Sequence, residues 1–315
     1  MSHRTVDQLL IHTADLLDAG RQAALCLLYR TRGSTPANAG ALMVIDDHAE
    51  LAGTIGGGCI EAEVRKRAFA LIGEGTDATF AFQLDHDYGW DDGLICGGQV
   101  DVLVWQARDP ASLRRIAHEC QSRQTTSLSM DVSAPDSPAE QQRFILHLPP
   151  RPRLLIAGAG HVGSALSRMA IAVDFDVCVF DDRADLLERF IADPAQRICG
   201  PIHETITDEP IDDETYIVIV TRGHKHDEQV LEAVASTAAR YLGMIGSRRK
   251  VKLIFDDLIE RGVPETTLQR VHAPIGIDIN SVTVPEIAVS IVAELIAERR
   301  QHSTPPVQGP IDLSV

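Results

Sequence analysis

The stretch GTIGGGCIEAEV at residues 53–64 ends an apolar run with three glycines and a cysteine: Gly56, Gly57, Gly58 and Cys59. A helical pattern with Glu61 in its first turn begins at once. Such a loop exposes backbone N–H groups that can surround an anion, and it places a thiol beside them. A tight turn between two close backbones, with Cys59 as a small buried residue, would use the same residue types.

A second cysteine–glycine junction, LICGGQVDVLV at residues 94–104, contains Cys96, Gly97 and Gly98. Two such junctions in one small domain indicate a shared site, where Cys59 and Cys96 could contact a soft metal or carry sulfur. By contrast, Cys26 and Cys178 lie inside apolar strand-like runs and are expected in the core. No C-x-x-C pair is present, so zinc-ribbon spacing is absent.

The segment RLLIAGAGHVGSAL carries a third glycine pattern, Gly158-x-Gly160-x-x-Gly163, between a strand and a helix. The glycines allow a tight turn, close approach of a phosphate and close helix–strand packing. Asp181 follows eighteen residues after Gly163 and could accept hydrogen bonds from a ribose hydroxyl. This pattern predicts a Rossmann-like fold that could bind NAD or another nucleotide. His161, inside the loop, is either a ligand contact or a helix N-terminal side chain.

Polar loops follow two later strands, in the segments TRGHKHD (221–227) and IGSRRK (245–250). The carboxyl ends of parallel strands line the ligand crevice of a doubly wound sheet. The side chains expected around one anionic ligand there are Arg222, His224, His226, Ser247, Arg248 and Arg249. Two alternatives stay open: Ser247 could only cap a helix, and His224 and His226 with Asp227 could bind a metal.

The elements that must position these residues change character at the proline-rich segment PPRPR, residues 149–153. Residues 1–149 mix helices, hairpins and strands, which predicts a smaller α+β domain. Residues 150–302 alternate apolar strands with amphipathic helices, which predicts a doubly wound parallel sheet in an α/β Rossmann-like domain. Residues 303–315 are expected to form a disordered tail.

Composition limits the functions that these domains can have. The 315-residue chain has a net charge of −16 and 4% aromatic residues, which argues against a nucleic-acid partner. The first twenty residues contain no uninterrupted apolar run, and no segment is long and apolar enough for a membrane span. A cytoplasmic protein without a membrane partner is therefore expected.

In the order and spacing of its motifs, the sequence resembles the XdhC/CoxI family of xanthine dehydrogenase accessory proteins. The resemblance covers nearly the whole chain. The matching segments are RGSTPANAGALMVI, GTIGGGCIEAEV, LICGGQVDVLV, LIAGAGHVGSAL, VTRGHKHDEQVL, YLGMIGSRRK and HAPIGIDI. One departure is INSVTVPEIAV at residues 279–289, which puts the contacts of this C-terminal loop in doubt.

The resemblance implies a chaperone that is not itself a turnover enzyme. It would bind the molybdenum cofactor (molybdopterin), promote exchange of an oxo for a sulfido ligand, and deliver the cofactor to an apo molybdenum hydroxylase such as xanthine dehydrogenase. A cysteine desulfurase would supply the sulfur, and a homodimer is a reasonable expectation. Two other hypotheses stay open: an NAD-dependent oxidoreductase based on the Rossmann loop, and a sulfur-transfer enzyme with a persulfide on Cys59 or Cys96.

Overall fold

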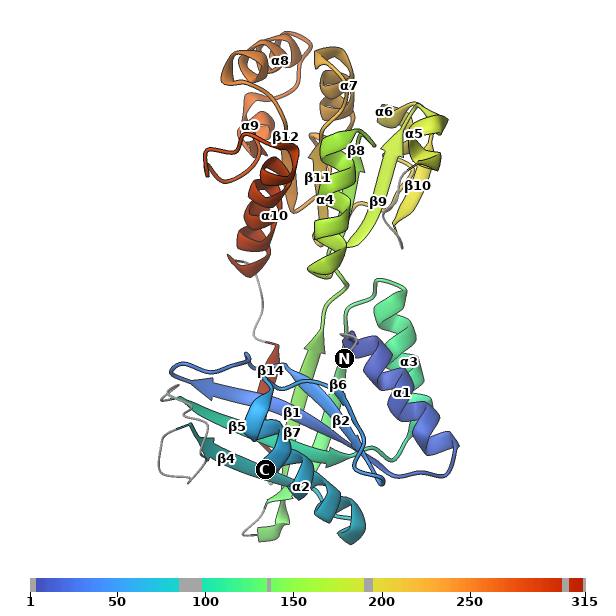
Figure 1. Ribbon diagram of the computed structural model, residues 1–315, viewed down its shortest axis with the longest axis vertical. Helices are drawn as coiled ribbons and strands as arrows, with labels where there is room; N and C mark the ends of the chain where they lie inside the picture. The colour runs from blue at the N-terminus through green and yellow to red at the C-terminus, as the bar shows by residue number, and fades with distance from the viewer. Residues whose placement is uncertain (1–3, 85–97, 135–136, 190–194, 302–305, 314–315) are drawn as a thin grey trace. The chain divides into compact units, whose positions relative to one another are not determined.

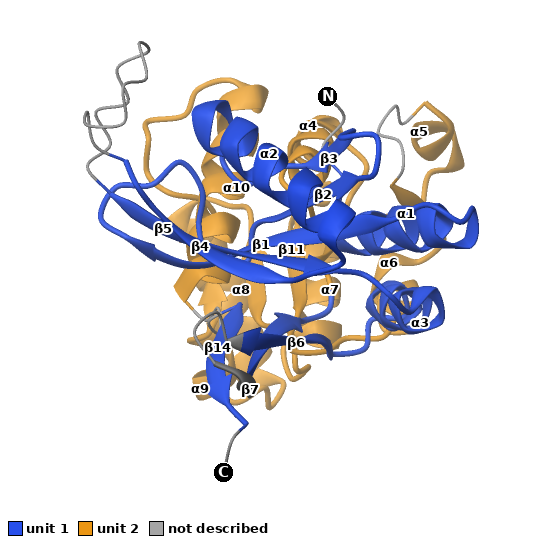
Figure 2. Ribbon diagram, turned by 90° about the horizontal axis from the view of Figure 1, so that it is seen from below, with its two compact units in different colours: residues 1–150, 304–315 blue, residues 151–303 orange. Residues whose placement is uncertain are grey.

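The computed structural model describes the chain except residues 1–3, 85–97, 135–136, 190–194, 302–305 and 314–315. The chain forms two compact units, and each is described by itself (Figure 2). Unit 1 comprises residues 1–150 together with residues 304–315, and unit 2 comprises residues 151–303.

Unit 1 is built on a five-stranded antiparallel sheet in the order β3-β2-β1-β5-β4 (Figure 1). Its strands are β1 (Ala23–Arg32), β2 (Leu42–Asp46), β3 (Leu51–Gly53), β4 (Ala78–Gln83) and β5 (Gln99–Gln106), and its helices are α1 (Val6–Asp18), α2 (Gly58–Glu74) and α3 (Pro110–Gln121). The expected hairpin around residues 46–50 is the β2–β3 pair.

Both faces of this sheet are covered, which explains why β1 is apolar at successive positions. Leu25 and Leu27 pack in a core formed with α1, α3 and the strands β6 (Thr126–Ala134) and β7 (Ser137–Leu148). Cys26 and Leu28 point to the opposite face and pack against α2. The predicted burial of Cys26 is thereby confirmed, since its exposed fraction is 0%.

A second sheet in unit 1 has the strand order β14-β7-β6. Its antiparallel strands are β6 (Thr126–Ala134), β7 (Ser137–Leu148) and β14 (Val307–Asp312). The expectation of a disordered tail at residues 303–315 is wrong for β14. This strand forms backbone hydrogen bonds with the edge of β7 that would otherwise be unpaired, with Val307 opposite Leu146 and Gln308 opposite Ile145. Strand β7 begins at Ser137 and pairs with β6 along its length, with Ser133 opposite Gln141 and Thr126 opposite Leu148.

Unit 2 is a six-stranded parallel sheet in the order β10-β9-β8-β11-β12-β13 (Figure 1). Its strands are β8 (Arg153–Ala157), β9 (Asp176–Asp181), β10 (Gln196–Cys199), β11 (Thr215–Ile219), β12 (Tyr241–Met244) and β13 (Val271–His272). Its helices are α4 (His161–Ala172), α5 (Ala184–Glu188), α6 (Ile202–Thr205), α7 (His224–Val234), α8 (Arg248–Glu260), α9 (Glu265–Leu268) and α10 (Val284–Gln301). The α/β fold with a Rossmann-like parallel sheet is as predicted.

Helices cover both faces of the unit 2 sheet, and alternate strand residues serve the two cores. Leu154 and Ile156 pack with α4 and α10, whereas Leu155 and Ala157 pack with α7 and α8. The strand order reverses direction between β8 and β11, so the loops after these two strands diverge at the carboxyl edge of the sheet. Ligands bind at this position in doubly wound sheets. Among the described residues, no helix is long and apolar enough to cross a bilayer.

Candidate functional site

The three consecutive glycines form a turn that only glycine adopts readily. Gly56, Gly57 and Gly58 have φ angles of 122°, 78° and 66°. A Cβ atom on Gly56 would lie 2.8 Å from Pro36 Cγ, so this glycine is required by packing. A Cβ on Gly57 or Gly58 would have no atom within 4 Å. The backbone at Gly57 and Gly58 is therefore open to a ligand.

Glu61 holds this turn in place. Its Oε1 accepts hydrogen bonds from Thr54 Oγ1 at 2.5 Å, from Ile55 N at 3.1 Å and from Gly57 N at 2.9 Å. The carboxylate thus takes N–H groups that the sequence suggested for a bound anion. Glu61 therefore fixes the turn, and its contact with a cofactor stays a prediction.

Cys59 is the second residue of α2, and its side chain is half-buried. Three other cysteines, Cys26, Cys120 and Cys178, are buried. Burial raises the pKa of all three thiols, to about 11 for Cys120 and about 12 for Cys178, so they are poor nucleophiles. Cys199 is exposed on β10. Within unit 1, Cys59 is therefore the described cysteine that combines access with a neighbouring open backbone.

The loop at residues 33–37 contacts both glycine-rich segments of unit 1. Gly56 packs against Pro36, as described above, and a Cβ on Gly98 would lie 2.2 Å from Ser34 O and 2.9 Å from Arg32 O. The backbones at Gly98 and at Arg32 and Ser34 approach so closely that only glycine fits at position 98. The other two residues of this junction, Cys96 and Gly97, lie outside the described residues.

Charged residues of the paired strands β1 and β5 lie near this loop, and the sequence analysis did not single them out. Asp101 is buried and accepts hydrogen bonds from Arg30 Nε at 2.5 Å and from Gln99 Nε2 at 3.1 Å. Arg32 is exposed and forms no ion pair with a described residue. Sequence reasoning could have found Arg32 from its position as the first residue of the segment RGSTP, directly before the loop. Arg32 is a cation that an anionic ligand near the loop could meet.

In unit 2, the glycines after β8 act as the fingerprint predicts. A Cβ on Gly158 would lie 2.6 Å from Val220 O, and a Cβ on Gly163 would lie 1.9 Å from Gly158 O. Gly160 precedes α4 as its N-cap and leaves open space where a Cβ would be. His161, the first residue of α4, is exposed. The turn and the close helix packing are therefore in place.

Asp181 lies at the end of β9 and is 1% exposed. Its Oδ2 accepts a hydrogen bond from Ala159 N at 2.8 Å, and both of its oxygens bind the Arg183 guanidinium. Burial alone would raise the pKa of Asp181, but the bonds from Arg183 and Ala159 N–H hold it below its usual value. The carboxylate stabilises the glycine loop and does not face solvent, which differs from the expected ribose contact. Asp182, the next residue, is more exposed and binds Arg222 at 2.9 Å.

An ion pair joins the first turns of α7 and α8, the helices that follow β11 and β12. Asp227 is fully buried, its Oδ2 binds Lys250 Nζ, and its Oδ1 accepts Thr221 N at 3.1 Å. Asp227 is thereby used within the protein, which does not favour the metal alternative with His224 and His226. No group of three or more metal-ligating side chains occurs in the part of the chain that the structure describes.

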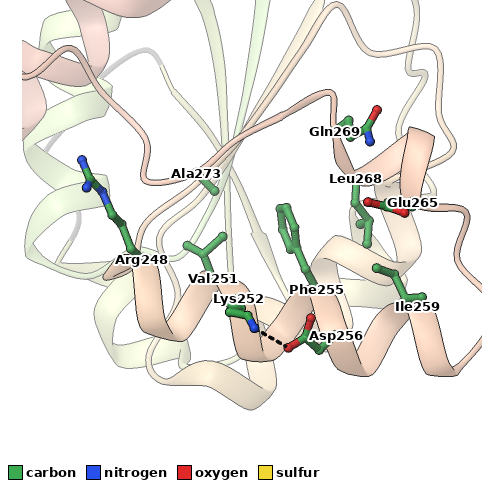
Figure 3. A pocket seen from close by; sticks show the side chains of 10 residues that line it. All are labelled: Arg248, Val251, Lys252, Phe255, Asp256, Ile259, Glu265, Leu268, Gln269 and Ala273. Atoms are coloured by element: carbon green, nitrogen blue, oxygen red, sulfur yellow. Dashed lines mark ion pairs between the residues drawn. The ribbon is translucent and has the colours of Figure 1, made fainter.

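The remaining predicted residues of this edge lie at helix starts. His224 is exposed at the start of α7. Ser247 caps α8, with its Oγ accepting Lys250 N at 3.2 Å. Arg248 follows and lines a groove between α8 and α9 (Figure 3). The capping alternative for Ser247 is therefore seen in the structure.

A further polar cluster lies at the β13 edge, and sequence reasoning missed it. Glu294 of α10 accepts Tyr241 OH at 2.6 Å, Gly276 N at 2.7 Å and His272 Nδ1 at 3.1 Å. The Glu294 carboxylate raises the pKa of His272, and burial together with this carboxylate raises the pKa of Tyr241. These three residues are 22 to 53 positions apart in the chain, so no local motif indicates them. The cluster anchors the segment after β13.

Comparisons with known proteins agree with this two-unit organisation. The family model described as "XdhC and CoxI family" matches residues 16–83, and the model described as "XdhC Rossmann domain" matches residues 154–295. A crystal structure of a xanthine dehydrogenase from Bacillus halodurans superposes with a TM-score of 0.82 and 22% identity, covering 96% of this chain and 97% of that chain. This likeness shows a shared fold.

Three curated relatives are similar along most of the chain. "Uncharacterized protein YqeB" of Escherichia coli is 27% identical over 87% of this chain, which spans 43% of that longer protein. A protein of Bacillus subtilis described as a probable xanthine dehydrogenase subunit is 26% identical and is covered over 96% of its length. "Molybdenum cofactor insertion chaperone PaoD" of Escherichia coli is 24% identical and is covered over 89% of its length.

Proposed function

The chain belongs to the XdhC and CoxI family, and from this premise we propose that it is a maturation chaperone for a molybdenum hydroxylase. In this proposal the chain binds the molybdenum cofactor as cargo, supports its sulfuration and delivers it to an apo-enzyme such as xanthine dehydrogenase. The relatives named as a molybdenum cofactor insertion chaperone and a xanthine dehydrogenase subunit support this role.

One structural observation carries the proposal. The backbone at Gly57 and Gly58, with open space at both Cβ positions, lies directly before the half-buried thiol of Cys59. The Glu61 carboxylate fixes the turn by accepting a hydrogen bond from Gly57 N. The cargo combines an anionic pterin phosphate with a soft dithiolene–metal group. Glu61 takes the N–H groups of Ile55 and Gly57, so the backbone contact with the anion falls to the Gly58 N–H group, and a thiol suits a soft metal. The residues present in unit 1 therefore fit both ends of this chemistry.

In the proposed division of roles, Cys59 contacts the metal end of the cargo, and the Gly58 backbone and Arg32 contact its anionic part. Cys96 is proposed as a second soft contact. A cysteine desulfurase would be the sulfur donor, which requires that the metal end stay accessible to a second protein. The half-exposed position of Cys59 at a helix start is compatible with such access.

A nucleotide ligand in unit 2 is the second candidate, and the open Gly160 at the start of α4 favours it. The cytidine dinucleotide form of the cofactor and NAD would both bring a pyrophosphate to this loop. Titration with NAD and with a cytidine nucleotide, followed by calorimetry, distinguishes these ligands. Tight binding of NAD with hydride transfer to a substrate would favour an oxidoreductase instead of a chaperone.

The thiol part of the proposal is tested by cofactor retention in cysteine variants. The protein is co-expressed with cofactor biosynthesis, purified without oxygen, and analysed for molybdenum and for fluorescent pterin oxidation products. We expect Cys59→Ala and the double variant Cys59→Ala/Cys96→Ala to lose most of the bound cofactor. The control Cys199→Ala removes an exposed cysteine of unit 2 and is expected to retain it. Equal retention by all four proteins would remove the thiols from the proposal.

The backbone part is tested by a matched pair of glycines on α2. Gly58 at its start and Gly75 at its end have φ angles of 66° and 73°, and both have open space at the Cβ position. Alanine at either position costs about 1–2 kcal/mol of backbone strain. Both variants should lose similar stability, but Gly58→Ala alone should weaken cofactor binding. Equal cofactor content in the two variants would contradict a role for the turn.

A further inference from the structure

Asp181 lies at the end of β9, where dinucleotide-binding Rossmann folds carry an acid that binds the ribose hydroxyls of the cofactor. In this chain its carboxylate already accepts four hydrogen bonds. Oδ1 accepts the backbone N–H of Arg183 at 3.0 Å and the Nε–H of the same residue at 2.8 Å. Oδ2 accepts Ala159 N at 2.8 Å and Arg183 Nη2 at 2.9 Å. A carboxylate has about four lone-pair sites, so these bonds leave none for a ribose diol.

Arg183 provides three of these four bonds, and two of them come from its guanidinium. Such bidentate pairing is the strong form of an arginine–carboxylate contact. The Asp181 side chain is 1% exposed, whereas the Arg183 side chain is 31% exposed. A ligand can therefore bind the carboxylate only after the guanidinium has left it.

The neighbouring carboxylates limit what else this end of β9 can bind. Arg183 Nε also lies 3.8 Å from Asp182 Oδ1, and Asp182 Oδ2 accepts Arg222 Nη2 at 2.9 Å. Asp185, in the first turn of α5, adds a further negative charge close to Arg183. Together with Asp181, three of the described carboxylates accompany two guanidinium groups here. A 2′-phosphate, which an arginine receives in NADP-binding folds, would meet this excess of negative charge.

We propose that Arg183 is a specificity-determining residue that excludes nucleotides with a free ribose diol, such as NAD, from unit 2. Its guanidinium takes the bonds to Asp181 that the ribose hydroxyls would need. Gly160 still leaves open space at the start of α4, so the exclusion acts on the ribose and not on the phosphate. This assignment rests on the second candidate ligand considered above, a nucleotide in unit 2, and is independent of the thiols in unit 1.

The exclusion is tested by calorimetric titration of the full chain with NAD. Arg183→Met keeps a long unbranched side chain but donates no hydrogen bond, so Asp181 regains two acceptor sites. We expect a Kd above about 1 mM for the wild type and at least about a tenfold lower Kd for Arg183→Met. Removal of a cation should by itself weaken binding of an anionic ligand, so a gain identifies the released carboxylate. A wild-type Kd below about 10 µM, or no gain in Arg183→Met, would overturn the proposal.

Two further variants show whether a gain acts through Asp181. In Asp181→Asn/Arg183→Met one acceptor oxygen is replaced by an amide, so the double variant should lose the gain. The matched control Arg168→Met removes an exposed arginine of α4 that bonds to Ser164 Oγ at 3.4 Å, and it should bind NAD as the wild type does. A gain that persists in the double variant, or that appears equally in the control, would exclude the assigned role of Arg183.

Titration with NADP tests the alternative that the arginines receive a 2′-phosphate. We expect the wild type to bind NADP no more tightly than NAD, because of the three carboxylates at this end of β9. NADP binding at least about tenfold tighter than NAD binding would contradict the proposal.

A second substitution keeps the test decisive if circular dichroism shows that Arg183→Met does not fold. Arg183→Lys retains the positive charge but has a single donor nitrogen, so it should give a smaller gain in NAD affinity than full release of Asp181. No gain in a folded Arg183→Lys would then count against the proposal. The carrier function is measured separately, because molybdenum and pterin content is read from the wild type without added nucleotide.

Discussion

At the scale of single residues, Glu61 decides how the triple-glycine turn presents its backbone. Its Oε1 binds Thr54 Oγ1, Ile55 N and Gly57 N, so the turn is fixed without a ligand. Ile55 is fully buried, and its N–H group has no access to water. The carboxylate therefore stabilises a conformation in which the backbone next to Cys59 stays open.

We predict that Glu61→Ala lowers the free energy of unfolding of unit 1 by about 1–3 kcal/mol, because the buried Ile55 N–H loses its acceptor. Glu63→Ala is the matched control on the same helix. Glu63 pairs with Arg67 at 2.7 Å on the surface, and its loss should cost about 0.5 kcal/mol or less. Urea unfolding of both variants measures the difference. Equal losses would show that Glu61 makes only a surface contact.

The sequence singles out the glycines and Cys59 of this turn but not the residues that support them. A glycine run signals unusual backbone geometry because few other residues allow it. The bonds of Glu61 depend on where the turn places its N–H groups, and the contacts of Gly98 with the loop at residues 33–37 depend on strand register. Asp181 illustrates the same limit: the sequence predicted its position at the end of a strand, but not its burial or its bonds to Arg183.

At the scale of elements, close packing of α4 on β8 and α10 on β13 shapes the carboxyl edge of unit 2. Gly163 brings α4 against the turn at Gly158, and Glu294 connects α10 to His272 and Gly276. The first contact belongs to a local motif that the sequence shows. The second joins distant positions, and the apolar pattern of α10 gives no sign of it.

We predict that Gly163→Ala destabilises unit 2 by about 1–3 kcal/mol, because its Cβ would overlap Gly158 O. Gly160→Ala is the control, since Gly160 has a φ of −69° and open space around the Cβ position. Its effect on stability should stay within about 0.5 kcal/mol. Thermal unfolding followed by calorimetry measures both. Similar losses at the two positions would contradict the packing role of Gly163.

The His272–Glu294 pair makes stability depend on pH in a defined direction. The pKa of His272 is raised, chiefly by its bond to Glu294, so its contribution is complete below about pH 6.5 and is lost as the pH rises through its folded value. For Glu294, burial raises the pKa, but the bonds from His272 and Tyr241 outweigh it and lower the value. Its contribution is therefore lost only in acid.

We therefore predict that His272→Gln destabilises unit 2 more at pH 6 than at pH 8, as measured by urea unfolding at both values. A change that is equal at the two pH values would mean that the pair is not charged in the folded protein. His203→Gln is a suitable control, because the one partner of His203 within the described residues is Glu204, at 3.6 Å on the surface.

At the scale of the whole molecule, the chain leaves unit 1 at residue 150 and returns to it at residue 304. The proline-rich segment and the change to strand–helix alternation indicated the first crossing. The second was not predicted, because the sequence around β14 contains three prolines and a glycine, which favour an irregular tail. Edge pairing with β7 overrides that local preference.

We predict that a chain ending at residue 303 destabilises unit 1 and leaves unit 2 unchanged, since β14 pairs only within unit 1. Amide exchange in β7 should accelerate by about tenfold or more, because the strand loses its partner on one side. A chain ending at Leu313 keeps β14 and serves as the control. Unchanged exchange in β7 after the longer truncation would contradict the pairing.

The central claim, that the chain carries the molybdenum cofactor, is tested most directly by the ligand content of the wild-type protein. The protein is co-expressed with cofactor biosynthesis, kept free of oxygen, and analysed for metal and for pterin oxidation products. We predict near-stoichiometric molybdenum and pterin. A protein that contains neither, and retains a nicotinamide or adenine nucleotide instead, would contradict the carrier function and favour an oxidoreductase that uses the Rossmann-like unit.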